Sequence, residues 1–169
     1  MAFDSLGEFV EELEKQGELI RINTVVSPKL EIAEINDRLI KNNGAALLFE
    51  HVEGSEFPVL INAMGSKRRI EMVFGVDDIE ELANDIKSLF DMLSSPKDGI
   101  IAKLKMLPQL KEIASWTPKR SSKKGCCQEV VMSEVDLRKL PVLTTWPFDG
   151  GPFFTFPVVH SLSLEKGSH

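Results

Sequence analysis

The sequence predicts an α/β fold in which helices and short strands alternate and pack in layers. Apolar residues recur at helical spacing over residues 6–13 and again over residues 32–39. Between and after these segments lie short strand-like runs at residues 18–22, 45–49 and 59–61. The first run alternates polar and apolar side chains, whereas the other two are continuously apolar, as in strands buried on both faces. Alternation of such elements along a chain favours helices layered on a sheet.

The predicted boundaries of the first two helices rest on local signals. Ser5 and Glu8 have the spacing of a capping box, which starts a helix. Gly17 stands where that helix should stop, because glycine readily adopts the left-handed conformation of a helix C-terminus. The run Asn42-Asn43-Gly44 has turn chemistry and is predicted to end the second helix.

Further helices are predicted after the third apolar run. Ser66 is a candidate N-cap for a short helix that ends near Phe74. The longest amphipathic stripe of the chain then runs from Ile79 to Leu93, which predicts a helix of about four turns. Residues 100–114 also have helical spacing, with a break expected at Pro108.

A polar hinge at Ser121–Gly125 is the predicted domain boundary, because the pattern changes after it. Residues Gln128–Met132 and Phe153–Leu162 have the composition of strands, separated by loops rich in proline, glycine and tryptophan. The sequence therefore predicts an α/β domain at residues 1–120 and the start of a second, incomplete domain at residues 121–169.

Composition and charge narrow the classes of function. The 169 residues carry a net charge of −6, which disfavours non-specific nucleic-acid binding. Residues 97–124 are the exception, with eight basic and two acidic side chains; they form either a solvated surface or a contact with an acidic partner or another subunit. No leader peptide and no apolar run long enough to cross a bilayer is expected, so the predicted location is cytoplasmic.

Local metal, redox and phosphate motifs are not expected from the sequence. His51, His160 and His169 each lack a second ligand at the spacing of a metal site. The adjacent Cys126 and Cys127 do not form a CxxC motif, and their short link disfavours a disulfide between them. The run Gly65–Arg69 could hold an anion at a helix N-terminus, but solvated cations are the simpler interpretation.

The segment Leu140–Pro157 is unusual, because prolines interrupt a strongly apolar run. The whole segment therefore cannot form one central strand of a sheet. Gly150-Gly151 permits a tight turn or a close approach of a ligand to the backbone. Large rings beside threonines suit a pocket for a flat ligand. A packed loop beneath a barrel is equally compatible with these residues.

Several ordered motifs together make the chain resemble the amino-terminal part of UbiD-type carboxy-lyases. The resemblance spans essentially the whole chain. The segments that carry it are Leu6-x-x-Phe9-x-x-x-Leu13-x-x-x-Gly17-Glu18-Leu19-x-Arg21-Ile22, Leu30-Glu31-Ile32-x-Glu34-Ile35-x-Asp37-Arg38, Ala46–Glu50, Pro58-Val59-Leu60-x-Asn62-x-x-Gly65, Thr117-Pro118-Lys119, Cys127-Gln128-Glu129, Asp136-Leu137-x-x-Leu140-Pro141 and Thr145-Trp146-Pro147-x-Asp149-Gly150-Gly151-Pro152-Phe153-x-Thr155.

The resemblance implies a non-oxidative decarboxylase of aromatic or α,β-unsaturated carboxylic acids, of the kind that acts in quinone biosynthesis. It implies prenylated FMN as cofactor, with manganese and potassium, and a homo-oligomer of two or more subunits. It also implies that an amino-terminal α/β domain is followed by the first strands of a split β-barrel of the flavin-reductase type.

The resemblance assigns one site residue in this chain. Thr155 matches a threonine that contacts the flavin in family members. The asparagine and arginine of the next family element would begin directly after His169, so no catalytic or metal-binding residue is expected here. The chain alone is therefore expected to be inactive and to bind no cofactor. A non-catalytic α/β module for assembly or partner binding is the alternative interpretation.

Overall fold

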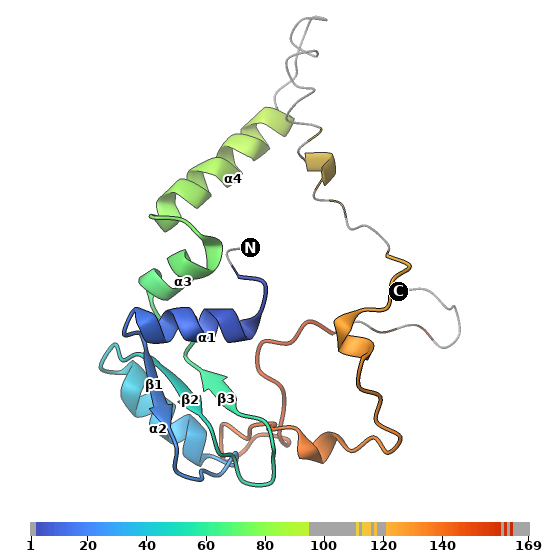
Figure 1. Cartoon of the computed structure of the whole chain (residues 1–169). Helices are drawn as coiled ribbons and strands as arrows, with labels where there is room; N and C mark the ends of the chain where they lie inside the picture. The colour runs from blue at the N-terminus through green and yellow to red at the C-terminus, as the bar shows by residue number, and fades with distance from the viewer. Residues whose placement is uncertain are drawn as a thin grey trace, which may run out of the picture. The chain divides into compact units, whose positions relative to one another are not determined.

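The computed structural model describes residues 3–94, 111, 113–115, 117, 121–159, 161 and 163. The chain divides into two compact units. Figure 1 labels their helices and strands and colours the chain by residue number. The first unit joins Met1–Asp77 to Asp136–His169, and the second comprises Asp78–Val135. The predicted boundary between residues 120 and 121 falls within the second unit and stays a prediction.

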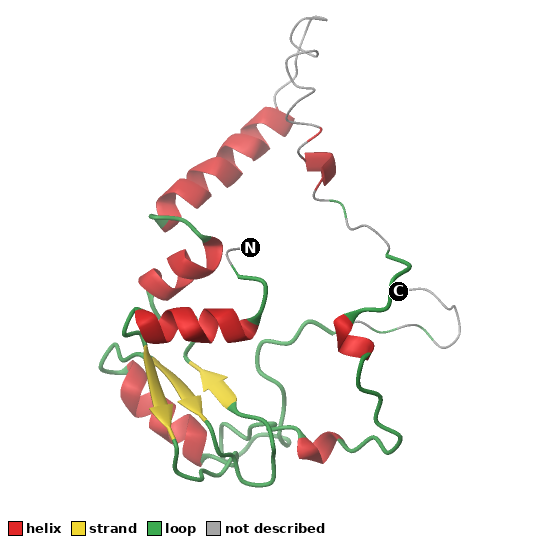
Figure 2. Ribbon diagram, in the orientation of Figure 1, coloured by secondary structure: helices red, strands yellow, loops and turns green. Residues whose placement is uncertain are grey.

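A three-stranded sheet lies at the centre of the first unit (Figure 2). Its order is β1 (Leu19–Ile22), β2 (Ala46–Phe49) and β3 (Val59–Ile61). β2 runs parallel to β1 and antiparallel to β3. The crossover from β1 to its parallel neighbour contains helix α2 (Glu31–Ile40), as a parallel connection requires. The alternation seen in the sequence therefore corresponds to a mixed α/β arrangement.

The register of the sheet separates two hydrophobic clusters, one on each face. Leu47 and Phe49 point to one face, where they pack with Ile32 of α2 and with Val26, Val52, Val59 and Leu143. Ala46 points to the other face and packs with Phe9 and Leu13 of helix α1 (Leu6–Lys15). Because side chains alternate along a strand, a continuously apolar β2 can supply both clusters. The prediction of a strand buried on both faces is confirmed.

The caps predicted from the sequence are present at α1 and at helix α3 (Lys67–Phe74). The Ser5 Oγ accepts a hydrogen bond from the Glu8 backbone N–H, at 3.2 Å. The Ser66 Oγ accepts one from the Arg69 backbone N–H, also at 3.2 Å. α1 is followed by Gly17 and α3 by Gly75, and both glycines have a positive φ. These local signals determine both ends of each helix.

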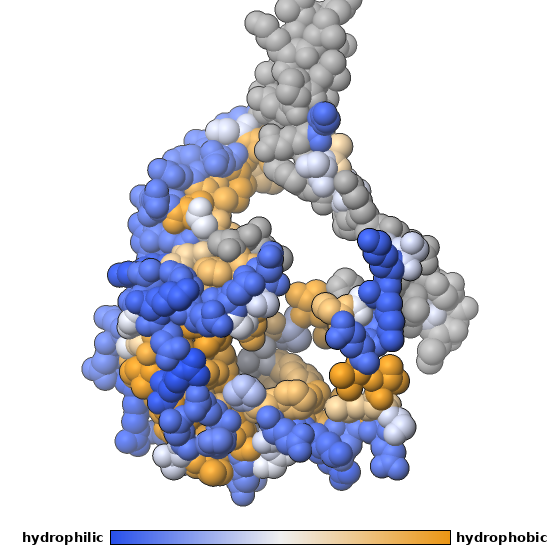
Figure 3. All heavy atoms as spheres, viewed as in Figure 1, coloured by the Kyte–Doolittle hydropathy of each residue, from blue (hydrophilic) through white to orange (hydrophobic). Residues whose placement is uncertain are grey.

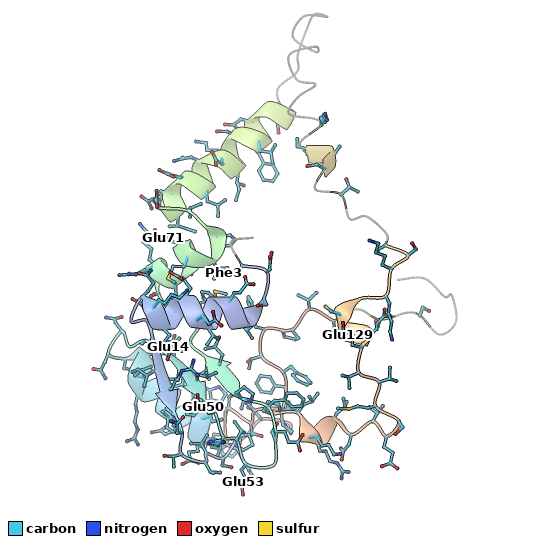
Figure 4. All side chains as sticks on the ribbon, in the orientation of Figure 1. Phe3, Glu14, Glu50, Glu53, Glu71 and Glu129 are labelled. Atoms are coloured by element: carbon cyan, nitrogen blue, oxygen red, sulfur yellow. The ribbon has the colours of Figure 1, made fainter. Side chains whose placement is uncertain are left out.

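Arg21 joins α1 to the sheet. Its guanidinium donates to both carboxylate oxygens of Glu14, at 2.7 and 2.8 Å, and to Glu50 Oε1 at 2.7 Å. Figure 4 labels both acidic partners, Glu14 on α1 and Glu50 just beyond β2. The two carboxylates raise the pKa of Arg21, with Glu14 the larger cause.

The second unit contains the long amphipathic helix α4 (Ile79–Ser94), as predicted. Its apolar stripe includes the exposed side chains of Ile86 and Phe90, and hydrophobic surface is visible along this helix (Figure 3). The predicted helix at residues 100–114 lies largely outside the described residues. Cys126–Gln128, which begins the predicted strand region, forms a short 3-10 turn.

The strands predicted at Gln128–Met132 and Phe153–Leu162 are not formed in the parts of these segments that the structure describes. That prediction was wrong for this chain. A strand is stabilised by hydrogen bonds to a neighbour, and none of the described segments pairs with residues 129–132. Phe153 takes part only in an isolated antiparallel bridge with Leu143. The split barrel itself stays a proposal.

Candidate functional site

The segment Leu143–Thr155, here called the Trp-Pro loop, is fastened to the first unit at its start. Leu143 is a buried member of the core cluster on the α2 face of the sheet. The Thr144 backbone N–H donates to the Pro28 carbonyl at 3.1 Å, and the Thr144 carbonyl accepts from the Leu30 backbone N–H at 2.9 Å. The Phe153 N–H donates to the Leu143 carbonyl at 3.0 Å, which brings the end of the loop back to its start.

A single carboxylate fixes the turn inside this loop. Asp149 Oδ2 accepts hydrogen bonds from the Thr145 N–H at 3.1 Å, the Thr145 hydroxyl at 3.0 Å and the Trp146 N–H at 2.9 Å. The Trp146 N–H, together with the Thr145 donors, lowers the pKa of the Asp149 carboxyl below its usual value. The charged form of Asp149 therefore holds the turn at neutral pH.

The Trp-Pro loop and the residues after it expose aromatic side chains instead of burying them. Trp146 is 67% exposed and Phe148 is fully exposed, and the rings of Phe153, Phe154 and Phe156 are also accessible. Several exposed aromatic side chains so close together in the sequence are typical of a ligand or partner contact. The loop is therefore anchored at its base but is not packed into a closed core.

A cleft lies between α2 and the start of the Trp-Pro loop, and we refer to it as the α2 cleft. Its volume is about 590 Å³, within the range of small-molecule sites. The apolar lining comes from α2 and its cap, from β3 and from the loop: Leu30, Ala33, Ile40, Ile61, Trp146 and Pro147. The polar lining consists of Glu34, Asn36, Asp37 and Thr145.

Leu30, at the wall of the cleft, has an unusual backbone conformation. Its φ is 69° although it is not a glycine, so its backbone is strained. The hydrogen bond from its N–H to the Thr144 carbonyl fastens this residue to the loop. Such strain persists only where the surrounding structure fixes it, and it is common at ligand clamps.

Thr155, the predicted flavin contact, lies at the end of the Trp-Pro loop and is exposed. Gly150 and Gly151 precede it, and a Cβ built on either glycine would meet no atom within 4 Å. The backbone there is thus open to a flat ligand, as the sequence suggested. The assignment of Thr155 to the flavin stays a prediction.

The other sequence candidates have different outcomes. His51 is exposed, while His160 and His169 lie outside the described residues. Among the residues that the structure describes, no group of three or more His, Cys, Asp or Glu side chains could hold a metal ion. The expectation of solvated cations at Gly65–Arg69 was wrong for Arg69, which is 1% exposed and donates to Glu18 Oε2 at 2.7 Å.

Family comparisons match both parts of the chain. Residues 10–86 match the 3-octaprenyl-4-hydroxybenzoate carboxy-lyase N-terminal domain, and residues 119–169 match the Rift-related domain of the same enzyme family. The chain belongs to the UbiD family. The Trp-Pro loop lies within the segment that matches the Rift-related domain of UbiD proteins.

Relatives and solved structures agree with this assignment. A protein from Archaeoglobus fulgidus is 40% identical over 167 residues, which cover 99% of this chain and 34% of the relative. The evolved dimeric form of the UbiD-class enzyme HmfF from Pelotomaculum thermopropionicum, solved with prFMN, is 25% identical with a TM-score of 0.57; the match covers 89% of this chain and 30% of HmfF.

The fold alone is also shared with Sedimentibacter hydroxybenzoicus vanillic acid decarboxylase in its closed form. The TM-score is 0.60 at 22% identity, over 89% of this chain and 29% of that one. The present chain thus spans about a third of the length of the proteins that it matches. In the described helices, none is long and apolar enough to cross a membrane.

Sequence reasoning missed the contribution of α2 to the cleft. In the sequence, Ala33, Asn36 and Ile40 are only positions on a predicted amphipathic helix. They line the same cleft as Trp146 because long-range backbone hydrogen bonds at Thr144 hold the loop beside α2. The role of Asp149 could have been suspected, because aspartate readily accepts hydrogen bonds from backbone groups in turns.

Proposed function

We propose that this chain is the amino-terminal part of a UbiD-class non-oxidative decarboxylase of aromatic or α,β-unsaturated carboxylic acids. The observation that carries the proposal is the Trp-Pro loop, which Asp149 fixes and which presents exposed rings next to Gly150-Gly151. We take this loop as one wall of the cofactor cleft. Residues 121–169 would then begin the split β-barrel that follows an α/β domain at residues 1–120.

The residues present fit one edge of a flavin. The open backbone at Gly150-Gly151 would allow a planar ring to approach closely, and we propose that the exposed Thr155 hydrogen-bonds a ring heteroatom. When bound, prenylated FMN would supply an electron sink for the electron pair that remains as CO2 leaves the substrate. The contribution of this chain is to position that ring and to exclude water from one side with its aromatic residues.

The described residues do not fit a manganese site, because they contain no cluster of three or more candidate ligands. We derive no role for manganese or potassium in this chain. The substrate is proposed only as a class, an aromatic or unsaturated acid. The proposed location is the cytoplasm, and the proposed assembly is a homo-oligomer.

Activity of the isolated chain tests the first part of the proposal. We expect the chain, incubated with prenylated FMN, manganese and a cinnamate-like acid, to release no CO2 above background, because none of its residues is assigned to the chemistry. A full-length UbiD-class decarboxylase run in parallel is the positive control. Release of CO2 by this chain would refute the proposal that residues 1–169 do not carry the catalytic residues.

A chimaera tests Thr155. Residues 1–169 of this chain are fused to the remainder of the Archaeoglobus fulgidus relative, which is 40% identical over the matched region. We expect Thr155→Val to lower flavin retention by the purified chimaera, while the exposed Thr117→Val leaves it unchanged. Equal retention by the two variants would contradict the assignment of Thr155.

A non-catalytic assembly module is the second candidate, and the second unit provides the observation that favours it. The consecutive side chains of Val130, Val131 and Met132 are exposed to solvent. Ile86 and Phe90 of α4 are also exposed. Exposed apolar side chains in such numbers favour coverage by a partner. Size-exclusion chromatography with light scattering distinguishes the cases, since a clean monomer would weaken the assembly role.

A further inference from the structure

We propose that the α2 cleft binds a primary ammonium group carried on an apolar stem, as in a small arylalkylamine. This inference goes beyond the proposed decarboxylation and does not depend on it. It rests on three features of the cleft: a fixed wall, an exposed indole and two carboxylates in the lining.

The wall of the cleft is formed before any ligand arrives. Backbone hydrogen bonds join Thr144 to Pro28 and Leu30, and three further hydrogen bonds to Asp149 fix Thr145 and Trp146. A site held in this way loses little conformational freedom on binding, which favours affinity. The strained backbone of Leu30 lies at the same wall.

The chemistry of the lining favours a cation on an apolar stem. Trp146 contributes an indole that is 67% exposed, and tryptophan is the ring that best attracts an ammonium group. Glu34 and Asp37 lie in the lining, whose described residues include no basic side chain. The apolar residues on either side of these groups would contact the hydrocarbon stem.

The two lining carboxylates can exchange their present partners at little cost. Glu34 pairs with Arg38 at 2.7 Å, and Asp37 pairs with Lys41; in each pair the partners are four residues apart. The side chains of Glu34, Arg38 and Lys41 are largely exposed and that of Asp37 is 46% exposed, and ion pairs in contact with solvent contribute little to stability. A ligand ammonium can therefore replace either cation.

Asn36 is a further polar residue of the lining. Its Oδ1 is buried and accepts no hydrogen bond from the part of the chain that the structure describes. Because this atom is covered by the protein, it does not contact a ligand in the cleft, and the Glu34 and Asp37 carboxylates remain the acceptors for a ligand donor. A primary ammonium brings three N–H donors, whereas a carboxylate or phosphate brings none and would be repelled by Glu34 and Asp37.

Binding of 2-phenylethylamine to the full chain tests the proposal. The readout is the indole N–H resonance of Trp146, with that of Trp116 as the internal reference. We expect a saturable shift of the Trp146 resonance. The neutral isostere 2-phenylethanol should bind about 3- to 30-fold more weakly, which is the range of a cation–π contribution. The anion 3-phenylpropanoate should cause no saturable shift.

Matched variants locate the site by ligand-observed titration. Trp146→Ala should weaken amine binding by about 3- to 30-fold. Phe148→Ala, in the same loop but outside the lining, should stay within about twofold of the parent. Glu34→Gln with Asp37→Asn should weaken binding about threefold and reduce its salt dependence, whereas the exposed Glu53→Gln should not. Each variant is first checked for the parent pattern of backbone amide resonances.

Three results would overturn the proposal. Equal affinity for the amine and the alcohol would show that the cleft recognises only apolar surface. Equal weakening by Trp146→Ala and Phe148→Ala would place the ligand elsewhere. A shift caused by a lysine-containing peptide but not by the amine would assign the cleft to a protein partner instead of a small ligand.

Discussion

Replacing Arg69 by methionine should destabilise the first unit, because Arg69 is a buried charge that fastens α3 to the sheet. Its Nη1 donates to Glu18 Oε2 at 2.7 Å, and its Nη2 donates to the Gly44 carbonyl at 3.3 Å. Glu18 precedes β1 and Gly44 precedes β2, so one side chain connects three elements. Methionine keeps much of the apolar stem but removes every donor.

The size of the effect follows from what the substitution leaves behind. Breaking a fully buried ion pair costs about 3–5 kcal/mol, mostly because the remaining charge has no partner. Here the Glu18 side chain is 22% exposed, and Arg68 lies 3.9 Å away, so water and a second cation lessen the cost. The Gly44 carbonyl keeps its hydrogen bond from Asn62. We therefore expect a loss of about 2–3 kcal/mol in the free energy of unfolding.

Urea unfolding followed by circular dichroism measures this loss. Arg38→Met removes an exposed pair with Glu34 and should cost no more than about 1 kcal/mol. Adding Glu18→Gln to Arg69→Met should recover part of the stability, with a coupling energy of about 1–2 kcal/mol in a double-mutant cycle. A cost for Arg69→Met equal to that of Arg38→Met would refute the argument that burial makes this pair important.

Two further predictions concern the Trp-Pro loop and the glycines. Since hydrogen bonds lower the pKa of Asp149, the charged form stabilises the loop above the unfolded value of about 3.9, and this stabilisation is lost as the pH falls through the lower, folded pKa. The amide resonance of Trp146 should therefore titrate below about pH 3.9, and Asp149→Asn should abolish that titration. Gly65→Ala should cost about 1–3 kcal/mol, because its Cβ would lie 1.6 Å from Asn62 Oδ1. Gly7→Ala, inside α1 with its nearest atom at 3.6 Å, should instead gain about 0.5–1 kcal/mol.

Clear controls accompany these two predictions. A titration midpoint of Trp146 at or above the unfolded value would contradict the role given to Asp149. Thermal melts compare the two alanine variants, and the same sign for both would show that neither the contact at Asn62 nor helix propensity decides the outcome.

The sequence by itself determined the local features of this protein. Ser5 and Ser66 marked the starts of α1 and α3, and Gly17 marked the stop of α1, because caps depend only on neighbouring residues. The continuous apolar run at β2 indicated burial on both faces of the sheet, because successive side chains of a strand point to opposite faces. The ordered motifs indicated the UbiD family, which both domain matches then showed.

Only the tertiary structure decided which of these features meet. Arg69 looked like one of three solvated cations, but packing of α3 places it in the interior beside Glu18. The strands expected after residue 125 had the right composition yet do not form in the described residues, because strand pairing needs a neighbour that composition does not reveal. The α2 cleft likewise exists because backbone hydrogen bonds hold Thr144 against Leu30, residues far apart in the sequence, and such long-range pairing leaves no signal at either position alone.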